Sequence, residues 1–445
     1  MFFRAVPLLL LATSCSPSRF GSDLHEHPAR CDMPAYTWLD DPTLGDVLER
    51  EPIRAYEPAD IAKLLDSLKD TGQAVVDRRP QYRAFLDRFR YVTQDKGALT
   101  EATGMYAWPI GDGPFPILIV THGTTGYSDA CAPSRIAMDD PLAPDALIAG
   151  ALATFGYVVV STDYLGMKSM GAPSTERHPY IVGEPTAIAS LDAGRAAYKL
   201  AHDDKVALGD LFIVGASQGG HAAAMTARYQ PHYATDLHPT AGLYLIPPLN
   251  LLGHLRRVRE PGVDPVTLGN AGAVAMGHAS WFGSPGGLGK ILKPHWAQAI
   301  DDATRTSCAL PEIDAPIADV FTPEALSALA DDSFDLEPWG CMLRESSLVE
   351  MTVPQLDVLP ALVVTGEVDP LVDAAVEREG TQKLCAEGMQ IEFVECAGKD
   401  HGGAVEASIN QIFSFIDDRT AQKPLEGFCA NAPTRICASD PRAYN

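Results

Sequence analysis

Six mainly apolar runs alternate with segments of helical pattern, and this alternation constrains the fold more than any other feature. The runs are FPILIVTHG (115–123), YVVVSTDY (157–164), DLFIVGAS (210–217), AGLYLIPP (241–248), LPALVVTGE (359–367) and QIEFVECAG (390–398). Helical patterns cover 144–155, 184–203, 218–230, 372–388 and 404–419. Continuous apolar runs are typical of strands buried on both faces. We therefore expect an α/β fold, a mostly parallel sheet with helices on both faces.

The alternation stops between residues 249 and 353, where Gly-rich loops and short helical patterns follow one another. A plain loop is rarely that long, so we predict an inserted, mainly helical cap. Upstream, a charged helix is expected over 61–87 and strands over 88–95 and 99–110. The expected segments are a signal peptide (1–14), an N-terminal lead (15–60), the first part of the core (61–248), the cap (249–353), the second part of the core (354–420) and a cysteine-containing tail (421–445).

The formal net charge of −24 limits the partners that this chain can bind. Phosphate backbones would be repelled, so we predict no binding to nucleic acid. The acidity fits a soluble exported protein, and steering of a cationic substrate is the alternative. Oligomeric state leaves no signal in the sequence.

The N-terminal stretch MFFRAVPLLLLATSCS has the features of an export signal. Arg4 precedes an apolar stretch over 5–12 that is too short to span a bilayer. Thr13 and Ser14 then precede Cys15, which resembles a bacterial lipobox with Ala12 where Leu is usual. We predict lipidation of Cys15 and attachment to the cell envelope, with cleavage and secretion or periplasmic release as the alternative. No later apolar stretch predicts a transmembrane helix.

Eight further cysteines support export, because an even set in an exported chain predicts up to four disulfides. Cys385 ends a helix far from the predicted active-site face, whereas Cys396 ends the next strand on that face, roughly 20 Å away. Disulfides need Cα atoms within about 7 Å. Cys385 should therefore avoid Cys396, and it could pair with a cysteine of the tail. The eight are Cys31, Cys131, Cys308, Cys341, Cys385, Cys396, Cys429 and Cys437.

Ser217 lies in Gly215-Ala216-Ser217-Gln218-Gly219, between a predicted buried strand and a predicted helix. The pattern G-x-S-x-G in this context is typical of a nucleophile held at a sharp turn, whereas alone it is weak. The alternative is an ordinary Gly-rich turn. We predict that Ser217 is a nucleophile.

A base and an orienting acid follow two later strands in the order Ser, Asp, His. Asp369 comes after the strand 359–367, and His401 comes after the strand 390–398. We predict Asp369 as the acid and His401 as the base. Glu367 and Asp400 are competing acids. His221, four residues after the serine on the same helix, should point away from its hydroxyl.

The reaction also needs donors for the negative oxygen of the tetrahedral intermediate. We expect one backbone N–H from Gln218 and the other from the loop after the strand 115–123. In that loop Thr124 is the first choice and Thr125 the second. There is no H-E-x-x-H motif, so we predict neither a metal nor another cofactor.

Residues 88–420 resemble the α/β-hydrolase superfamily, and within it the secretory lipases of the fungal lipase A type and their bacterial relatives. The matching stretches are THGTTG (121–126), CAPS (131–134), STDYLGM (161–167), HPY (178–180) and GASQGG (215–220). The resemblance implies ester hydrolysis, an acyl cavity under the cap, no cofactor, and the triad Ser217, Asp369 and His401. It also implies that Cys131 pairs with Cys308 or Cys341.

Together these features predict a serine carboxylester hydrolase, a lipase or esterase that acts on a small-molecule or lipid ester through an acyl-enzyme. A serine peptidase of the same fold and an esterase of polysaccharide or phenolic acyl groups are the alternatives. Four cap residues, Trp281, Phe282, Leu288 and Leu292, are expected either to wall the acyl site or to form the interior of the cap. The sequence does not indicate the acyl length, the alcohol of the ester or whether the cap moves.

Overall fold

A computed structural model of the protein describes most of the chain from residue 26 onward. The described residues are 26–259, 263–284, 287–309, 312–331, 334–356, 358–425, 427–430 and 433–444. The predicted signal peptide and Cys15 lie outside them. No helix among the described residues is long and apolar enough to cross a membrane.

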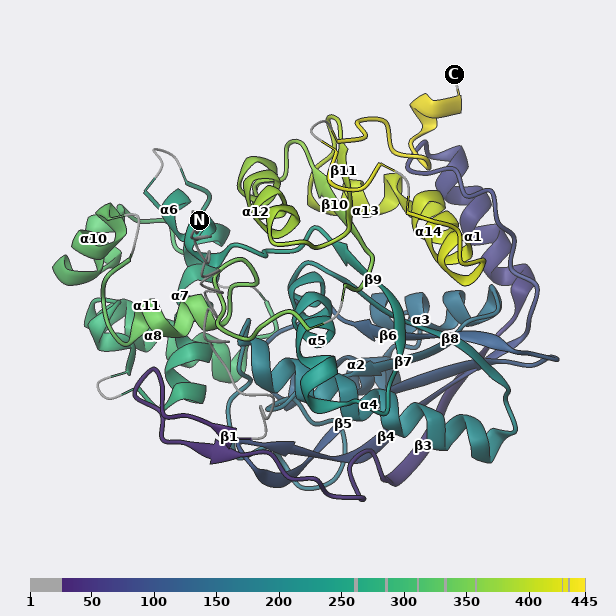
Figure 1. The fold of residues 1–445 in the computed structure, drawn as a ribbon, viewed down its shortest axis with the longest axis horizontal. Helices are drawn as coiled ribbons and strands as arrows, with labels where there is room; N and C mark the ends of the chain where they lie inside the picture. The colour runs from purple at the N-terminus through teal and green to yellow at the C-terminus, as the bar shows by residue number, and fades with distance from the viewer. Residues whose placement is uncertain are drawn as a thin grey trace, which may run out of the picture.

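A nine-stranded sheet forms the centre of the described structure, in the order β11-β10-β9-β8-β6-β7-β5-β4-β3 (Figure 1). Strands β6 to β11 pair in parallel, whereas β3, β4 and β5 add an antiparallel edge. This confirms the predicted α/β-hydrolase fold. The strands are β3 (Val47–Tyr56), β4 (Ala84–Asp95), β5 (Ala98–Pro109), β6 (Phe115–Thr121), β7 (Val158–Thr162), β8 (Leu208–Ala216), β9 (Pro239–Leu245), β10 (Ala361–Gly366) and β11 (Ile391–Cys396). Two short strands, β1 (Glu26–His27) and β2 (Tyr36–Thr37), form a separate pair.

Helices cover both faces of the sheet because alternate side chains of each buried strand point to opposite sides. In β8, Leu211 and Ile213 join one buried cluster, and Phe212 and Val214 join the other. The first cluster includes residues of α4 (Gly183–Asp204), α5 (Gln218–Tyr233) and α12 (Ala374–Ala386). The second includes residues of α1 (Pro58–Asp70), α2 (Pro133–Asp139), α3 (Pro144–Thr154), α13 (His401–Ala407) and α14 (Ile409–Thr420).

The segment between β9 and β10, which we call the cap, has an apolar interior of its own. Its helices gather at one end of the molecule, at the left in Figure 1. Asp264 and Thr322 cap two of them by accepting backbone N–H groups. The cap boundaries at 249 and 353 remain a prediction. The helices are α6 (Leu251–Arg257), α7 (Pro265–Phe282), α8 (Pro294–Thr306), α9 (Ile317–Val320), α10 (Pro323–Ala330) and α11 (Trp339–Glu345).

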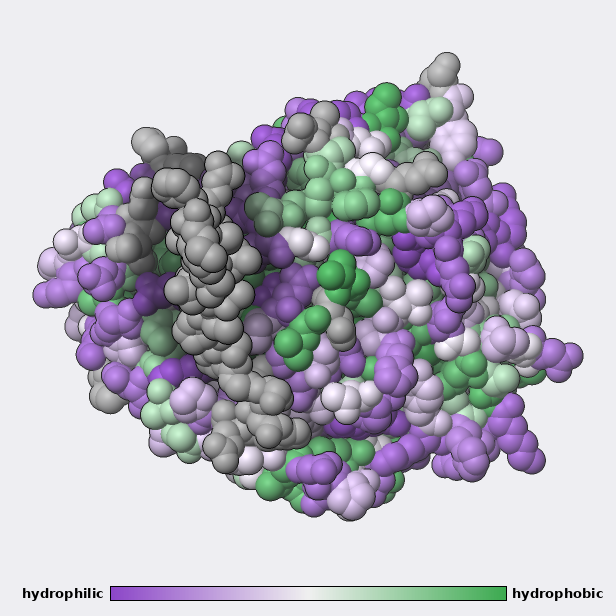
Figure 2. All heavy atoms as spheres, viewed as in Figure 1, coloured by the Kyte–Doolittle hydropathy of each residue, from purple (hydrophilic) through white to green (hydrophobic). Residues whose placement is uncertain are grey.

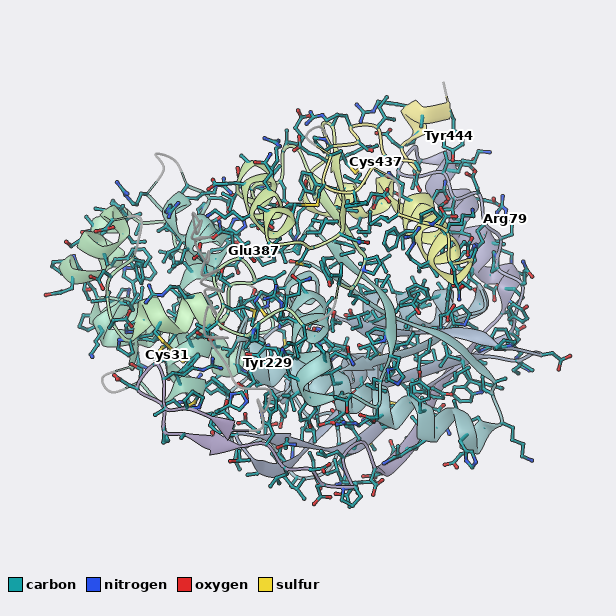
Figure 3. The ribbon with its side chains drawn as sticks, in the orientation of Figure 1. Cys31, Arg79, Tyr229, Glu387, Cys437 and Tyr444 are labelled. Carbon is teal, nitrogen blue, oxygen red and sulfur yellow. A yellow bond between two sulfur atoms is a disulfide. The ribbon has the colours of Figure 1, made fainter. Side chains whose placement is uncertain are left out.

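Four disulfides join segments that are distant in the sequence. Cys31–Cys341 and Cys131–Cys308 tie the cap to the rest of the chain. Cys385–Cys429 and Cys396–Cys437 tie the C-terminal tail to α12 and β11. In Figure 3, Cys31 lies beside the cap, and Cys437 lies in the tail. The prediction that Cys385 avoids Cys396 and pairs with the tail is confirmed. Cys131 pairs with Cys308, one of the two partners that the resemblance implied.

Three elements differ from the sequence-based expectation. Helix α1 ends at Asp70, so the helix expected over 61–87 was too long. Strand β3 lies within the predicted lead, where no strand was expected. It is an edge strand that pairs only with β4 and carries many charged residues, so its sequence has no continuous apolar run. The helix expected over 404–419 is two helices, which meet at Ser408.

The surface in Figure 2 is mostly hydrophilic with small hydrophobic groups, which fits the charge of −24.

Candidate active site

Ser217 occupies a strained turn between β8 and α5. Its φ of 58° and ψ of −122° lie in a region that residues other than glycine rarely adopt. Its N–H donates to Leu245 O at 2.9 Å, and its carbonyl accepts from His221 N at 3.1 Å. The N–H of Ser217 is therefore paired with the neighbouring strand β9, and its carbonyl is paired with the first turn of α5. The strand and the helix together fix the position of the hydroxyl.

The glycines around Ser217 are required by close backbone approach. A Cβ on Gly215 would collide with Thr121 Oγ1 and Gly219 O, and a Cβ on Gly219 would collide with Thr121 O. A Cβ on Gly220 would lie 2.6 Å from Leu245 O. The spacing of G-x-S-x-G thus follows from helix α5 packing directly against the end of β6, and Gly220 lets the same helix approach the end of β9.

Ser217, His401 and Asp369 form a continuous chain of hydrogen bonds. Ser217 Oγ lies 2.9 Å from His401 Nε2, and His401 Nδ1 lies 2.6 Å from Asp369 Oδ2. The other carboxylate oxygen, Oδ1, accepts from Leu371 N at 2.8 Å and Val372 N at 2.9 Å. Two backbone donors therefore hold the acid in place. This arrangement can transfer the serine proton to the imidazole and stabilise the resulting cation.

The competing acids and the nearby histidine have other partners. Glu367 accepts from Gly398 N at 2.7 Å and pairs with Arg435. Asp400 caps α13 by accepting from Gly403 N at 2.8 Å. His221 is buried and its Nε2 lies 2.7 Å from Ser346 O, in the cap. Burial lowers the pKa of His221 to about 4.

The residues expected to stabilise a negative oxygen lie beside Ser217. Thr124 and Gln218 both line the same cavity as Ser217, whereas Thr125 is not among its described lining residues. Thr124 Oγ1 shares a hydrogen bond of 2.8 Å with Tyr180 Oη. Burial raises the pKa of Tyr180 to about 12, so the phenol stays neutral.

His178 supports Gln218, a contact that sequence reasoning missed. Gln218 Nε2 donates to His178 Nε2 at 2.9 Å, and His178 Nδ1 donates to Leu165 O at 3.0 Å. Burial lowers the pKa of His178 to about 3, so the ring stays neutral and its Nε2 accepts. The HPY stretch was the available signal, but nothing in it indicates which residue the histidine would contact.

A cavity of about 360 Å³ opens beside Ser217 and extends under the cap. Its described lining is mainly apolar and includes no Asp or Glu. A larger hollow of about 810 Å³ lies at the C-terminal ends of α4 and α5 and contains none of the triad. The lining residues of the smaller cavity are Thr124, Tyr180, Ile181, Ser217, Gln218, Pro248, Leu251, His254, Leu255, Val258, Thr267, Asn270, Ala271, Val274, Ala275, Ile291, Phe321, Phe334, Trp339, Leu343, Leu371, Val372 and His401.

Comparison with known proteins agrees with this geometry. The family model "Secretory lipase" matches residues 142–427. The chain belongs to the secretory lipase family. It is accordingly a carboxylic ester hydrolase of the lipase and esterase class, and its substrate is an ester. No curated protein sequence matches this secretory lipase.

Two solved structures show the same fold as this secretory lipase. The rice cell wall degrading esterase LipA from Xanthomonas oryzae is 23% identical, with a TM-score of 0.67, over 86% of this chain and 97% of LipA. Lipase A from Candida antarctica is 16% identical, with a TM-score of 0.64, over 88% of this chain and 86% of that lipase. At these identities the likeness shows the fold alone.

The four cap residues proposed for the acyl site lie elsewhere in this secretory lipase. Trp281, Phe282, Leu288 and Leu292 belong to the buried apolar cluster of the cap and are absent from the described cavity lining, and Trp281 also donates to Asp95 Oδ1 of the core at 2.9 Å. The alternative role in the cap interior is therefore the one observed. Facing helices contribute the wall instead, through residues such as Val274, Trp339 and Leu343. The sequence pattern marks these helices as apolar but not which side meets the cavity.

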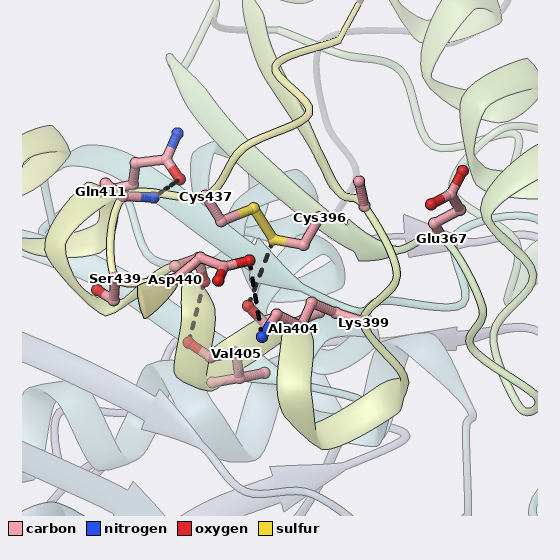
Figure 4. Close-up of a disulfide and its surroundings, with 12 residues drawn as sticks. Glu367, Cys396, Lys399, Ala404, Val405, Gln411, Cys437, Ser439 and Asp440 are labelled. Carbon is pink, nitrogen blue, oxygen red and sulfur yellow. Dashed lines mark hydrogen bonds and ion pairs between the residues drawn. A yellow bond between two sulfur atoms is a disulfide. The ribbon is translucent and has the colours of Figure 1, made fainter. Parts of the chain in front are cut away.

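The C-terminal tail of this secretory lipase braces the loop that carries His401. Glu395 N and Ala397 N donate to Thr434 O and Arg435 O, each at 2.9 Å, so the tail pairs along the edge of β11. The Cys396–Cys437 disulfide joins the end of that strand to the tail, and Lys399 pairs with Asp440 at 3.6 Å (Figure 4).

No group of three or more His, Cys, Asp or Glu side chains in the described ranges is placed to hold a metal ion.

Proposed function

We propose that Ser217, His401 and Asp369 form the catalytic triad of this ester hydrolase. The hydrogen-bond chain from Ser217 Oγ to Asp369 Oδ2, with distances of 2.9 and 2.6 Å, is the observation that carries the proposal. His401 Nε2 takes the proton of the serine hydroxyl as Oγ attacks the ester carbonyl. Asp369 holds Nδ1 protonated and stabilises the imidazolium that forms.

The carbonyl oxygen becomes negative in the tetrahedral intermediate and needs fixed donors. We assign the backbone N–H groups of Gln218 and Thr124 to this role. Both residues line the cavity at Ser217, and the dipole at the N-terminus of α5 favours negative charge there. The contacts of Gln218 with His178, and of Thr124 with Tyr180, position these two residues.

The intermediate then breaks down to an acyl-enzyme. His401 gives its proton to the leaving alcohol, and the acyl group stays on Ser217 Oγ. Water attacks this ester with His401 as the base, and the acid product leaves as the serine is regenerated. The chemistry of these steps needs no group beyond the triad, the two donors and water.

The apolar cavity favours an acyl chain as its occupant. A space of about 360 Å³ lined mainly by aliphatic and aromatic residues can bury an alkyl chain next to the reacting carbonyl. A peptidase that recognises a free amine would need a carboxylate there, and the described lining has none. A lipase or esterase is therefore favoured over a peptidase of the same fold.

Export follows from the family and from the four disulfides, which form and persist in oxidising compartments. We further propose that Cys15 is lipidated and attaches the protein to the cell envelope, as the N-terminal pattern predicts. Mass spectrometry of the mature N-terminus tests this. A mature chain that begins after residue 15, or that lacks a diacylglyceryl group on Cys15, contradicts it.

A nitrophenyl ester series of increasing acyl length, assayed beside an aminoacyl nitroanilide and a feruloyl ester, tests the proposed activity. We expect ester cleavage with a chain-length optimum and little amide cleavage. Ser217→Ala should lower kcat by at least about 10⁴-fold while the protein stays folded. Amide cleavage without ester cleavage, or full activity of Ser217→Ala, would overturn the proposal. Preference for the feruloyl ester would favour the phenolic-acyl alternative.

A further inference from the structure

The loop that precedes His401 is held by the C-terminal tail at its first two residues. Cys396, the last residue of β11, is joined to Cys437 by a disulfide, and both residues are buried. The next residue, Ala397, donates its N–H to Arg435 O at 2.9 Å. A covalent bond and a main-chain hydrogen bond therefore fix the start of the loop to the tail.

A buried carboxylate of the tail holds the middle of the same loop. Asp440 is 1% exposed, and its Oδ2 lies 3.6 Å from Lys399 Nζ, two residues before His401. Figure 4 shows this pair next to the disulfide. Arg442 pairs with the same carboxylate and donates to Ala397 O at 2.5 Å. The tail thus contacts both the side chain of Lys399 and the main chain of the loop.

Lys399 also connects this loop to the one that carries Asp369. Val368 N, one residue before that acid, donates to Lys399 O at 3.1 Å. A displacement of Lys399 would therefore disturb a hydrogen bond that the two loops share. The distance of 2.6 Å between His401 Nδ1 and Asp369 Oδ2 depends on the position of both loops.

The tail holds the chain on the other side of His401 as well. Ser439 N donates to Ala407 O at 2.7 Å, at the end of α13. Ser439 Oγ accepts from Asn410 N at 2.6 Å, near the start of α14. Tail residues between 435 and 442 therefore contact the chain both before and after the proposed base.

The second tail disulfide lies at the opposite end of β11. Cys385–Cys429 joins the tail to the C-terminal end of α12. Cys429 N donates to Ile391 O, and Ile391 is the first residue of β11, whereas Cys396 is the last. At about 3.3 Å per residue, the two ends of this strand are roughly 16 Å apart. One tail therefore has two disulfides, and one of them lies beside the loop of His401.

We propose that the tail is a positioning element for the base of the triad. Cys437, through its disulfide, and Asp440 keep the imidazole of His401 within hydrogen-bond reach of both triad partners. The proposal rests on the proposed function, because the tail acts through the triad. Neither Cys437 nor Asp440 is among the described residues that line the cavity. Proton transfer needs both hydrogen bonds of His401 at once, and a displacement of about 1 Å can lower a rate about 100-fold.

Removing each tail disulfide in turn separates positioning from stability. The two bonds have similar sequence separations, 41 and 44 residues, so loop-closure entropy predicts a similar loss of melting temperature. Alanine is the replacement because it leaves no buried hydroxyl. We expect Cys396→Ala with Cys437→Ala to lower kcat about tenfold and to change KM less than about twofold. Cys385→Ala with Cys429→Ala should change kcat less than about twofold.

Both double variants are assayed on a nitrophenyl ester well below their melting temperatures. Equal effects of the two pairs on kcat would overturn the positioning role, and so would a change in KM alone. A wild-type protein that hydrolyses esters while the two pairs behave alike contradicts the positioning role only. A wild-type protein without activity on any ester contradicts the proposed function instead.

Asp440→Asn tests the same role with both disulfides intact, and it decides the question if the alanine pair at 396 and 437 does not fold. The amide oxygen can still accept from Arg442 N, as Asp440 Oδ1 does at 3.0 Å, but the charge that attracts Lys399 is lost. We expect kcat to fall about threefold with KM unchanged, since an ion pair holds the loop less firmly than a covalent bond. Asp418→Asn removes a surface pair with Lys423 and is the matched control, with kcat unchanged. Equal kcat values in the two variants would overturn the role of Asp440.

Discussion

The core and the cap contribute to the active site in different ways. The core supplies the proposed triad from short loops at the carboxyl ends of β8, β10 and β11, and main-chain contacts fix each loop. Ser217 has a positive φ, and two backbone N–H groups hold Asp369. The cap supplies helix faces, and its side chains form most of the cavity wall.

This contrast indicates how each region tolerates substitution. A change at a strand end alters the position of a reacting atom and should act on kcat. A change on a cap helix alters the volume or polarity of the cavity and should act on which ester is preferred. The cap is also held at two disulfides, Cys31–Cys341 and Cys131–Cys308, so its position depends on covalent bonds as well as packing.

The largest effect is expected in the core, from Asp369→Asn. An amide at this position favours the wrong tautomer of His401 and does not stabilise the imidazolium, so kcat should fall by about 10³–10⁴-fold. The matched control is Glu367→Gln, an exposed acid two residues away, which should change kcat less than about threefold. Steady-state kinetics on a nitrophenyl ester measures both. A larger loss in Glu367→Gln would reassign the acid.

Removing one disulfide at a time compares how much the cap disulfide and the tail disulfide each stabilise the fold. Cys131–Cys308 spans 177 residues and Cys385–Cys429 spans 44. Loop-closure entropy assigns about 5 kcal/mol to the longer span and about 4 kcal/mol to the shorter, so replacing the cap pair by serines should destabilise the protein by about 1 kcal/mol more. Denaturant unfolding of the two double variants measures this. A larger loss from the tail pair would show that the cap disulfide adds little to folding.

Acid should weaken the contact between the core and the cap at His221. Burial lowers its pKa from 6.5 to about 4, so below pH 6.5 the unfolded chain binds the proton more readily than the folded one. The stability is complete above about pH 6.5 and is lost as pH falls toward 4, by roughly 2–3 kcal/mol. His221→Gln cannot titrate, and unfolding free energies from pH 7 to 4 should show a flatter slope. An unchanged slope would contradict the assignment.

The smallest effect is expected on the cavity wall. Val274→Phe adds volume to a residue of α7 that lines the cavity, so kcat/KM for the longest acyl esters should fall about tenfold relative to short ones. Ala318→Phe, on an exposed position of the cap, is the matched control and should leave the chain-length profile unchanged. If both variants shift the profile equally, Val274 does not define the acyl site.

Local patterns were sufficient to predict the central sheet and the candidate triad. Buried parallel strands require continuous apolar runs, which can be recognised in the sequence. The glycines at 215 and 219 are required by close backbone contact, so the motif around Ser217 can also be recognised from neighbouring residues. Ser217, Asp369 and His401 could be chosen because each follows such a run. Strand β3 was missed because it is an edge strand whose charged residues give no apolar pattern.

Only the tertiary structure decided which cap residues line the cavity. Trp281 and Val274 lie on the same helix, α7, yet Val274 lines the cavity whereas Trp281 packs away from it and donates to Asp95 of the core. Hydrophobicity alone does not separate the two, because both environments exclude water. The support of Gln218 by His178 and the pairing of the tail with β11 likewise join segments far apart in the sequence. Such contacts depend on chain packing, whereas strand, turn and helix signals depend on neighbouring residues.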